Sequence, residues 1–410
     1  MEKVKVYKNG LTLIVSEGGA NSASFAITIG TGSINETSKN NGISHYVEHM
    51  NFKGTDEYSS YDISNIMDSC GANYNAYTSV DSTCFYAQTI VEELEKTFSI
   101  MSANAFRSIY NEEECDKEKG VIIEEIYMSE DTPDDVCYDL SAKAYFGDNG
   151  YGRSVLGTAE NVKSFTRQDI LNYLKDYYVA ENIVIAFAGN VDFNKADELV
   201  QKYVLPYVRS SSLAPTPAHS ITSNRQHLTC QKDIEQVHFC LSFPSKSYLD
   251  NDKVKSEIAN GVLGGGMSSR LFMKIREELG LAYSVYSFAS RYKDAGTCSV
   301  YAGVNSNNYQ KAFDAVVGVI DEMKKGVLDS EIVKVKNQIK ASSVFAFEKP
   351  QSKVQIYSKH YLMTKEIYDP NQRLAQIDKV KKCDIDEVLS DFNFDQASSA
   401  IVGKSVNKLM

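Results

Sequence analysis

The chain has 410 residues, of which 43% are hydrophobic, and a formal net charge of −11. These values are typical of a folded protein with two or more domains. The negative charge, without a Lys/Arg cluster, argues against nucleic acid or an anionic membrane surface as a partner. The chain opens with alternating charged and apolar residues and has no apolar run of 18, so we expect neither a secretory signal nor a membrane span. Its eight cysteines form no C-x-x-C pair, which favours reduced thiols in a cytoplasmic protein.

Strand and helix patterns alternate along the first half of the chain. Asn9-Gly10 separates two alternating apolar stretches within 4–15 and predicts a β-hairpin. Further strands are expected at residues 22–31, 72–89 (as a pair) and 183–188. Helices are expected at residues 61–70, 112–130, 135–146 and 166–176, the last with Thr166 as its N-cap.

Residues 41–55, NGISHYVEHMNFKGT, contain two of the six histidines, His45 and His49, with Glu48 just before the second. In a helix, this four-residue spacing places both imidazoles on one face, close enough to bind one metal ion. Glu48 then lies beside that ion without having to coordinate it. A lone helical histidine is more often structural, but the complete H-x-x-E-H pattern is the reverse of the H-E-x-x-H zinc-peptidase motif and favours a metal site.

A catalytic zinc site usually has three protein ligands, so a third must come from elsewhere in the chain. The acidic helix expected at 112–130 offers several glutamates. Glu118 and Glu125 are seven residues apart and share one helical face. Glu124 lies about 100° round the helix from Glu125, so only one of the two can point at the metal. Helical geometry alone leaves Glu124 and Glu125 both open.

Three segments carry a resemblance to a known family. HYVEHMNFKGT, GANYNAYTSVDSTCFYA and EKGVIIEEIYMSEDTP resemble the pitrilysin/insulinase family of zinc metallopeptidases, in particular the short-chain branch that includes mitochondrial processing peptidase and its bacterial relatives. The resemblance implies that Glu125 is the third ligand of one Zn²⁺ per chain, and that Glu118 supports the site from behind. It also implies that Asn75, Ala76 and Tyr77 lie along an extended substrate.

The second half of the chain repeats the order of the first. Short polar residues and two prolines mark a linker at 209–226. We therefore expect a zinc-binding domain at 1–208 and a homologous domain at 227–410 without the H-x-x-E-H motif. The fold class is α+β, with two similar domains, each a mostly antiparallel sheet flanked by helices. Matching elements in the second half are a strand at 238–243, a long helical region at 254–278 and strands at 282–290, 297–304 and 399–403.

The stretch LGGGMSSRLFMKIREELGLAYSVYSF also resembles the family and contains Arg276 and Tyr283. On their own, Arg276 would suit a surface ion pair and Tyr283 a core position. The resemblance implies instead that both contact the substrate near the scissile carbonyl, where a guanidinium and a phenol donate hydrogen bonds to developing negative charge.

The resemblance spans essentially the whole chain and implies a zinc metalloendopeptidase that cleaves unfolded peptides or oligopeptides, with Glu48 as general base. The resemblance also implies that a chain of this length supplies half of a clamshell chamber, which a second chain closes. We therefore expect a dimer in a bacterial cytoplasm, either a homodimer or a heterodimer with a related chain. Two alternatives stay open: a processing peptidase that acts near the N-termini of precursors, and a non-catalytic subunit of a family complex.

Overall fold

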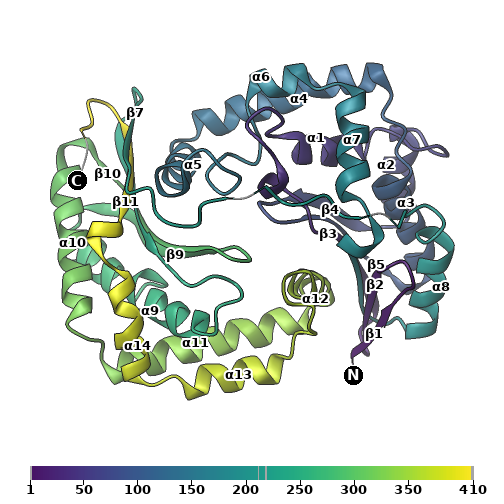
Figure 1. Ribbon diagram of the computed structural model, residues 1–410. Coiled ribbons are helices and arrows are strands. Elements are labelled where there is room, and N and C mark those ends of the chain that lie inside the picture. The colour runs from purple at the N-terminus through teal and green to yellow at the C-terminus, as the bar shows by residue number, and fades with distance from the viewer. Residues whose placement is uncertain (1, 211, 218, 408–410) are drawn as a thin grey trace. The chain divides into compact units, whose positions relative to one another are not determined.

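Residues 2–210, 212–217 and 219–407 are described by a computed structural model (Figure 1). The strands are β1 (Glu2–Val6), β2 (Thr12–Glu17), β3 (Ser22–Ile29), β4 (Asn73–Thr78), β5 (Thr83–Ile90), β6 (Ile183–Gly189), β7 (His227–Gln231), β8 (Gln236–Pro244), β9 (Ala282–Arg291), β10 (Gly296–Asn305) and β11 (Ser398–Gly403). The helices are α1 (Ile43–Met50), α2 (Ser60–Ser69), α3 (Leu94–Phe106), α4 (Glu112–Asp131), α5 (Pro133–Phe146), α6 (Ala159–Ser164), α7 (Arg167–Tyr177), α8 (Phe193–Tyr203), α9 (Lys253–Gly264), α10 (Tyr309–Lys324), α11 (Asp329–Glu348), α12 (Pro350–Thr364), α13 (Pro370–Lys379) and α14 (Lys382–Val388).

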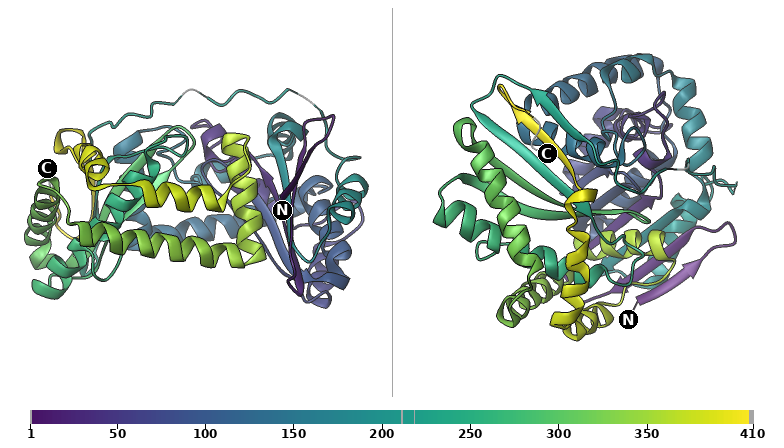
Figure 2. Two further views of the ribbon diagram at one scale, coloured as in Figure 1. Left: turned by 90° about the horizontal axis from the view of Figure 1, so that it is seen from below. Right: turned by 60° about the vertical axis from the view of Figure 1, so that its left-hand side comes forward.

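The described strands form two sheets with one topology. The first has the order β1-β2-β6-β3-β5-β4 and the second β7-β11-β8-β10-β9. Neighbouring strands are antiparallel, except that β2 pairs with β6 and β7 with β11 in parallel. In Figure 2, right, the yellow β11 lies in the teal and green second sheet. Apart from β1, strands β2 to β6 correspond in order and direction to β7 to β11. The predicted α+β fold, with two similar and mostly antiparallel sheets flanked by helices, is confirmed.

One face of each sheet is covered by helices from its own half of the sequence. On the first sheet, Phe25 and Phe187 pack against Phe98 of α3, with ring centroids 5.0 and 4.9 Å from that of Phe98. Side chains of α1, α2, α4, α6, α7 and α8 also belong to this core. On the second sheet, α9, α10 and α14 cover the corresponding face around Phe239 and Phe243. The alternation of apolar residues in the strands therefore predicts a buried face for each sheet.

The opposite face of each sheet is covered by a helix from the other half of the sequence. Helix α12 packs on β3 and β6, where Val354 and Tyr357 contact a small core with Ile14 and Val184. Helix α5 packs on β8 and β11, where Cys137 meets Cys240. Each of the two helices follows a 20-residue helix, α4 or α11, and begins with a proline, which suits the first turn of a helix.

The two compact units of the chain therefore differ from the contiguous domains expected from sequence. The first unit consists of Met1–Ile126, Ser154–Ala218 and Val344–Tyr368, and the second of Tyr127–Arg153, His219–Ser343 and Asp369–Met410. The apolar side of α5 or α12 predicts that the helix is buried, but it does not say which sheet the helix covers. Helix α4 starts in the first unit and ends in the second.

Local elements agree with the sequence patterns, with one interruption. Gly10 has a φ of 94° in the turn between β1 and β2, and Thr166 and Asp169 form a capping box at the start of α7. The long helical region expected at 254–278 is divided, because α9 ends at Gly264 and a π-helical segment, η4, spans Phe272–Glu278. A Cβ on Gly264 would come within 2.3 Å of Ser287 N, so this close approach requires glycine. No helix in the described ranges is long and apolar enough to cross a bilayer.

Candidate metal centre

Helix α1 carries the H-x-x-E-H motif, and its start is fixed by a buried carboxylate. Gly42 precedes the helix with a φ of 98°, which favours glycine. The fully buried Glu36 accepts hydrogen bonds from Gly42 N and Ser44 N, both at 2.8 Å. These N–H groups belong to the helix end that lacks intrahelical acceptors, so Glu36 acts as a cap supplied from outside the helix. His45 follows directly.

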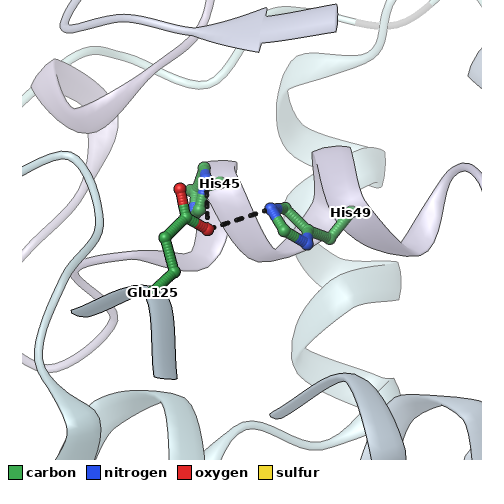
Figure 3. A group of neighbouring side chains, drawn as sticks. All are labelled: His45, His49 and Glu125. Atoms are coloured by element: carbon green, nitrogen blue, oxygen red, sulfur yellow. Dashed lines mark ion pairs between the residues drawn. The ribbon is translucent and has the colours of Figure 1, made fainter. Parts of the chain in front are cut away.

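Glu125 of α4 reaches the two histidines of α1, as Figure 3 shows. The imidazole centroids of His45 and His49 are 4.6 Å apart. Glu125 Oε2 lies 3.7 Å from His45 Nε2 and 3.4 Å from His49 Nε2. One ligand atom from each residue lies within 4.8 Å of the other two. Glu124, by contrast, is exposed on another side of α4. Between the two glutamates that helical geometry left open, the structure therefore brings Glu125 to the histidines.

Glu118 holds His49 from the opposite side of its ring. The Glu118 side chain is buried, and its Oε1 lies 2.9 Å from His49 Nδ1. Its other oxygen forms a 2.5 Å ion pair with Lys53 Nζ. A hydrogen bond between Nδ1 and a carboxylate fixes the ring and leaves Nε2 directed at Glu125. Glu118 therefore lies behind His49, and its role in supporting a metal site stays a prediction.

Burial and neighbouring charges shift the pKa values of the site in different directions. Burial lowers the pKa of His45 to about 4, so this imidazole is neutral at pH 7. Burial also acts to lower the pKa of His49, but hydrogen bonds and charges from Glu118 and Glu125 outweigh it and raise the value to about 9. Burial raises the pKa of Glu48 above its ordinary range.

The donor set fits a zinc ion. Two imidazole nitrogens and one carboxylate oxygen are the ligand types of catalytic zinc sites with three protein ligands. His45 Nδ1 is buried without a hydrogen-bond partner in the described chain, and His49 is held between two carboxylates. A divalent cation would offset the negative charge that Glu118 and Glu125 place around the imidazoles. The roles of these residues as ligands stay a prediction.

Strand β4 borders the site and carries the predicted substrate-contacting residues. In the described chain β4 pairs only with β5 and is the edge of the first sheet. Ala76 faces the core that includes α1, whereas Tyr77 points to the opposite face, where its ring centroid lies 6.1 Å from that of Tyr86. Asn75 is exposed, and its Oδ1 accepts a hydrogen bond from Ala76 N. The Tyr77 ring therefore points away from α1, whereas Ala76 lies on the side that carries the metal centre.

Sequence reasoning missed Thr78, which directly follows the predicted substrate segment. Thr78 Oγ1 donates a hydrogen bond of 2.5 Å to Glu48 Oε2. The alternation of a strand places Thr78 on the same face as Ala76, toward α1. The two-residue spacing from Ala76 to Thr78 therefore indicates, from the sequence alone, that Thr78 faces α1.

Arg276 and Tyr283 contact each other in the second unit. Arg276 lies on η4 and Tyr283 at the start of β9. The guanidinium carbon is 4.6 Å from the Tyr283 ring centroid, and Arg276 Nη1 donates to Tyr283 O at 3.1 Å. Tyr283 is 77% exposed, so it does not fill a core. The expected contact of this pair with substrate stays a prediction.

Two family models match the sequence over most of its length. The model described as Insulinase (Peptidase family M16) matches residues 11–159, and the model described as Peptidase M16 inactive domain matches residues 164–339. The chain is also 36% identical over 361 residues to YmxG of Bacillus subtilis, described as an uncharacterized zinc protease, with 87% of each chain covered. The chain belongs to the insulinase family of peptidases.

Other insulinase-family relatives and solved structures agree with this assignment. An uncharacterized zinc protease of Streptomyces coelicolor, SCO5738, is 34% identical over 397 residues, which cover 94% of this chain and 86% of that protein. The crystal structure of a protease from Helicobacter pylori has a TM-score of 0.92 at 22% identity, covering 98% of this chain and 99% of that one. A peptidase M16 inactive domain from Pseudomonas fluorescens has a TM-score of 0.91 at 16% identity, with 99% of each chain covered. The family resemblance stated from the motifs is confirmed, and the two solved structures share the fold.

Proposed function

We propose that this insulinase-family chain is a zinc-dependent endopeptidase that hydrolyses unfolded peptides or oligopeptides. The observation that carries the proposal is the convergence of His45, His49 and Glu125, whose ligand atoms lie within 4.8 Å of one another. Relatives that match most of the chain are named zinc proteases, which supports zinc as the metal. His45, His49 and Glu125 would hold one Zn²⁺ per chain.

The residues around this site have separate roles in the proposed reaction. When bound, zinc supplies a Lewis acid that polarises a peptide carbonyl and lowers the pKa of a water molecule. Glu48 Oε1 takes a proton from the attacking water and returns it to the nitrogen of the leaving amine. Glu118 keeps the His49 ring in place through Nδ1. Burial raises the pKa of Glu48, which brings this carboxylate closer to the pKa suited to a general base.

The free edge of β4 supports an extended binding mode for the substrate. An edge strand pairs with a peptide through main-chain hydrogen bonds, which place few demands on the sequence of that peptide. We assign this pairing to Asn75, Ala76 and Tyr77, because their strand lies at the sheet edge next to α1. Side-chain selectivity then depends on other surfaces around the site.

We further propose that two chains form the closed chamber in which cleavage takes place, in a bacterial cytoplasm. The zinc site of one chain would face the Arg276 and Tyr283 pair of its partner, whose guanidinium and phenol donate hydrogen bonds to the substrate carbonyl region. Exposure of Tyr283 supports a role at such a surface. Because the chain has both the zinc motif and this pair, a homodimer is proposed ahead of a heterodimer. Light scattering after size exclusion tests the stoichiometry directly.

The decisive experiment measures zinc per chain by mass spectrometry and cleavage of a quenched fluorescent peptide library. Wild type is expected to bind one zinc and to cleave, and Glu48→Gln to bind zinc without cleaving. Glu125→Gln is expected to lose zinc, whereas the matched change Glu124→Gln on the exposed side of α4 should behave as wild type. Zinc binding without cleavage would favour a non-catalytic subunit or a narrow processing activity, and absence of zinc from wild type would overturn the proposal.

A further inference from the structure

The side chain of Glu48 is positioned by one neighbour. Among the described residues, the hydrogen bond to its carboxylate comes from Thr78 Oγ1 on Oε2, at 2.5 Å. A glutamate side chain has three rotatable bonds, so a proton acceptor at its end needs an external contact to keep one orientation. Thr78 takes up one lone pair of Oε2, whereas no described residue donates a hydrogen bond to Oε1, so we place proton transfer at Oε1.

Thr78 is itself fixed by the turn between β4 and β5. Ser79 N and Ser79 Oγ both donate to Ser82 O, at 2.8 and 2.9 Å. The segment after β3 lies against this turn, and Ile34 N donates to Val80 O at 2.8 Å. A Cβ on Gly32 would come within 2.0 Å of Ser79 O, so the approach of the two segments requires glycine there. Lys359 of α12 adds an ion pair of 3.5 Å with Asp81.

We propose that Thr78 is a positioning residue that couples the proposed substrate strand to the general base. Thr78 is the last residue of β4, whose preceding residues are assigned to substrate pairing, and its hydroxyl sets the orientation of Glu48. Peptide binding along β4 and proton transfer by Glu48 therefore share one rigid element. This inference rests on the proposed function, and it predicts that the contribution of Thr78 appears in kcat rather than in KM or in zinc binding.

The test compares Thr78→Val with Thr78→Ser in the zinc-loaded enzyme, using a peptide from the cleavage library. Val keeps the branched shape and removes the hydroxyl, so kcat is expected to fall about 10- to 100-fold with KM nearly unchanged. Ser keeps the donor and is expected to retain kcat within about threefold. Zinc content and melting temperature should match wild type in both variants, since neither zinc ligand nor core packing is altered.

A matched control and a double variant sharpen the result. Thr89 on β5 is buried and its hydroxyl has no partner in the described chain, so Thr89→Val removes a hydroxyl from the same sheet without touching Glu48. It should leave kcat unchanged. In the Glu48→Gln background, Thr78→Val should produce no further loss, because Thr78 acts through Glu48.

The outcomes separate this inference from the proposed function. Two results would overturn the role of Thr78 alone while wild type still cleaves. In one, kcat is the same in Thr78→Val as in wild type. In the other, kcat falls equally in Thr78→Val and Thr78→Ser. An additive loss in the double variant would do the same. Zinc-loaded wild type that cleaves no peptide would overturn the proposed function and the role of Thr78 with it.

Discussion

His49 lies between two carboxylates, one at each ring nitrogen. Glu118 Oε1 is 2.9 Å from Nδ1, and Glu125 Oε2 is 3.4 Å from Nε2. Glu118 in turn is paired with Lys53, which limits the cost of burying its charge. This arrangement makes His49 the more constrained of the two histidines, because His45 Nδ1 has no partner in the described chain.

Replacing Glu118 with Gln is expected to weaken zinc binding about 10- to 100-fold. The change removes a negative charge beside His49 and leaves the Lys53 cation without its partner. Competition with a chromophoric chelator measures the affinity. Glu114→Gln is the control, since Glu114 lies on the same helix and pairs with Lys117 at the surface. Equal zinc affinities for wild type and Glu118→Gln would show that Glu118 does not support the site.

At the scale of single residues, the sequence predicted relative positions within one helix better than contacts between elements. The separation of His45 and His49 follows from helical geometry alone. The choice between Glu124 and Glu125 depends on how α4 is rotated about its axis, and this is decided by the burial of Ile122 and Ile126. The hydrogen bond from Thr78 to Glu48 depends on the distance between a strand and a helix, which no residue spacing specifies.

Helices α3 and α8 are joined by a charged cluster around Glu95. The carboxylate accepts hydrogen bonds from Lys195 at 2.6 Å, Lys202 at 2.9 Å and Tyr203 at 2.9 Å. These contacts, led by Lys195, lower the pKa of Glu95 to about 2. A carboxyl whose pKa is lower in the folded state stabilises that state above its unfolded pKa, and this contribution is lost as the pH falls through the folded value.

Glu95→Gln is therefore expected to lower the free energy of unfolding by about 1 kcal/mol at pH 7, a figure reduced for the partial exposure of Glu95 to solvent. The difference from wild type should shrink as the pH falls below 4.5 and vanish near 2. Urea titrations at about pH 7 and about pH 3 measure it. Exposed Glu92, whose side chain has no ion pair in the described chain, provides the control Glu92→Gln. An equal difference at both pH values would exclude a charge effect.

The whole molecule is built from two sheets that each take one helix from the other half of the sequence. Tyr357 of α12 is 1% exposed against the first sheet, and Cys137 of α5 is fully buried against the second. Burial of apolar side chains on both faces of a sheet stabilises it more than burial on one face. Neither sheet is therefore complete without the other half of the chain.

Residues 1–226 expressed alone are expected to bind a hydrophobic dye and to lack a near-ultraviolet circular dichroism signal, because Ile14, Ala26 and Val184 lose their cover from α12. Coexpression with residues 227–410 should restore both the signal and zinc binding. Dye fluorescence and circular dichroism of the isolated and coexpressed fragments measure this. A fragment that alone gives a native-like signal and binds one zinc would show that α12 is dispensable.

At the scale of the whole molecule, the duplicated order of strands was predictable, since strand patterns recur in both halves of the sequence. The sequence did not predict that α5 and α12 each cover the sheet of the other half of the chain. Both faces of an internal strand such as Ile183–Gly189 are apolar whichever helix covers them.

The exchange of helices also has a consequence for biosynthesis. The last strand of the first sheet, in chain order, ends at Gly189, but α12, which covers one face of this sheet, ends at Thr364. At roughly 5–20 residues per second, the ribosome needs about 9–35 s to add the intervening segment. During that time α12, which covers one apolar face of the first sheet in the folded chain, has not yet been synthesised. We therefore expect chaperones that bind exposed apolar surface to act on this face during that interval, after the metal-binding residues have been synthesised.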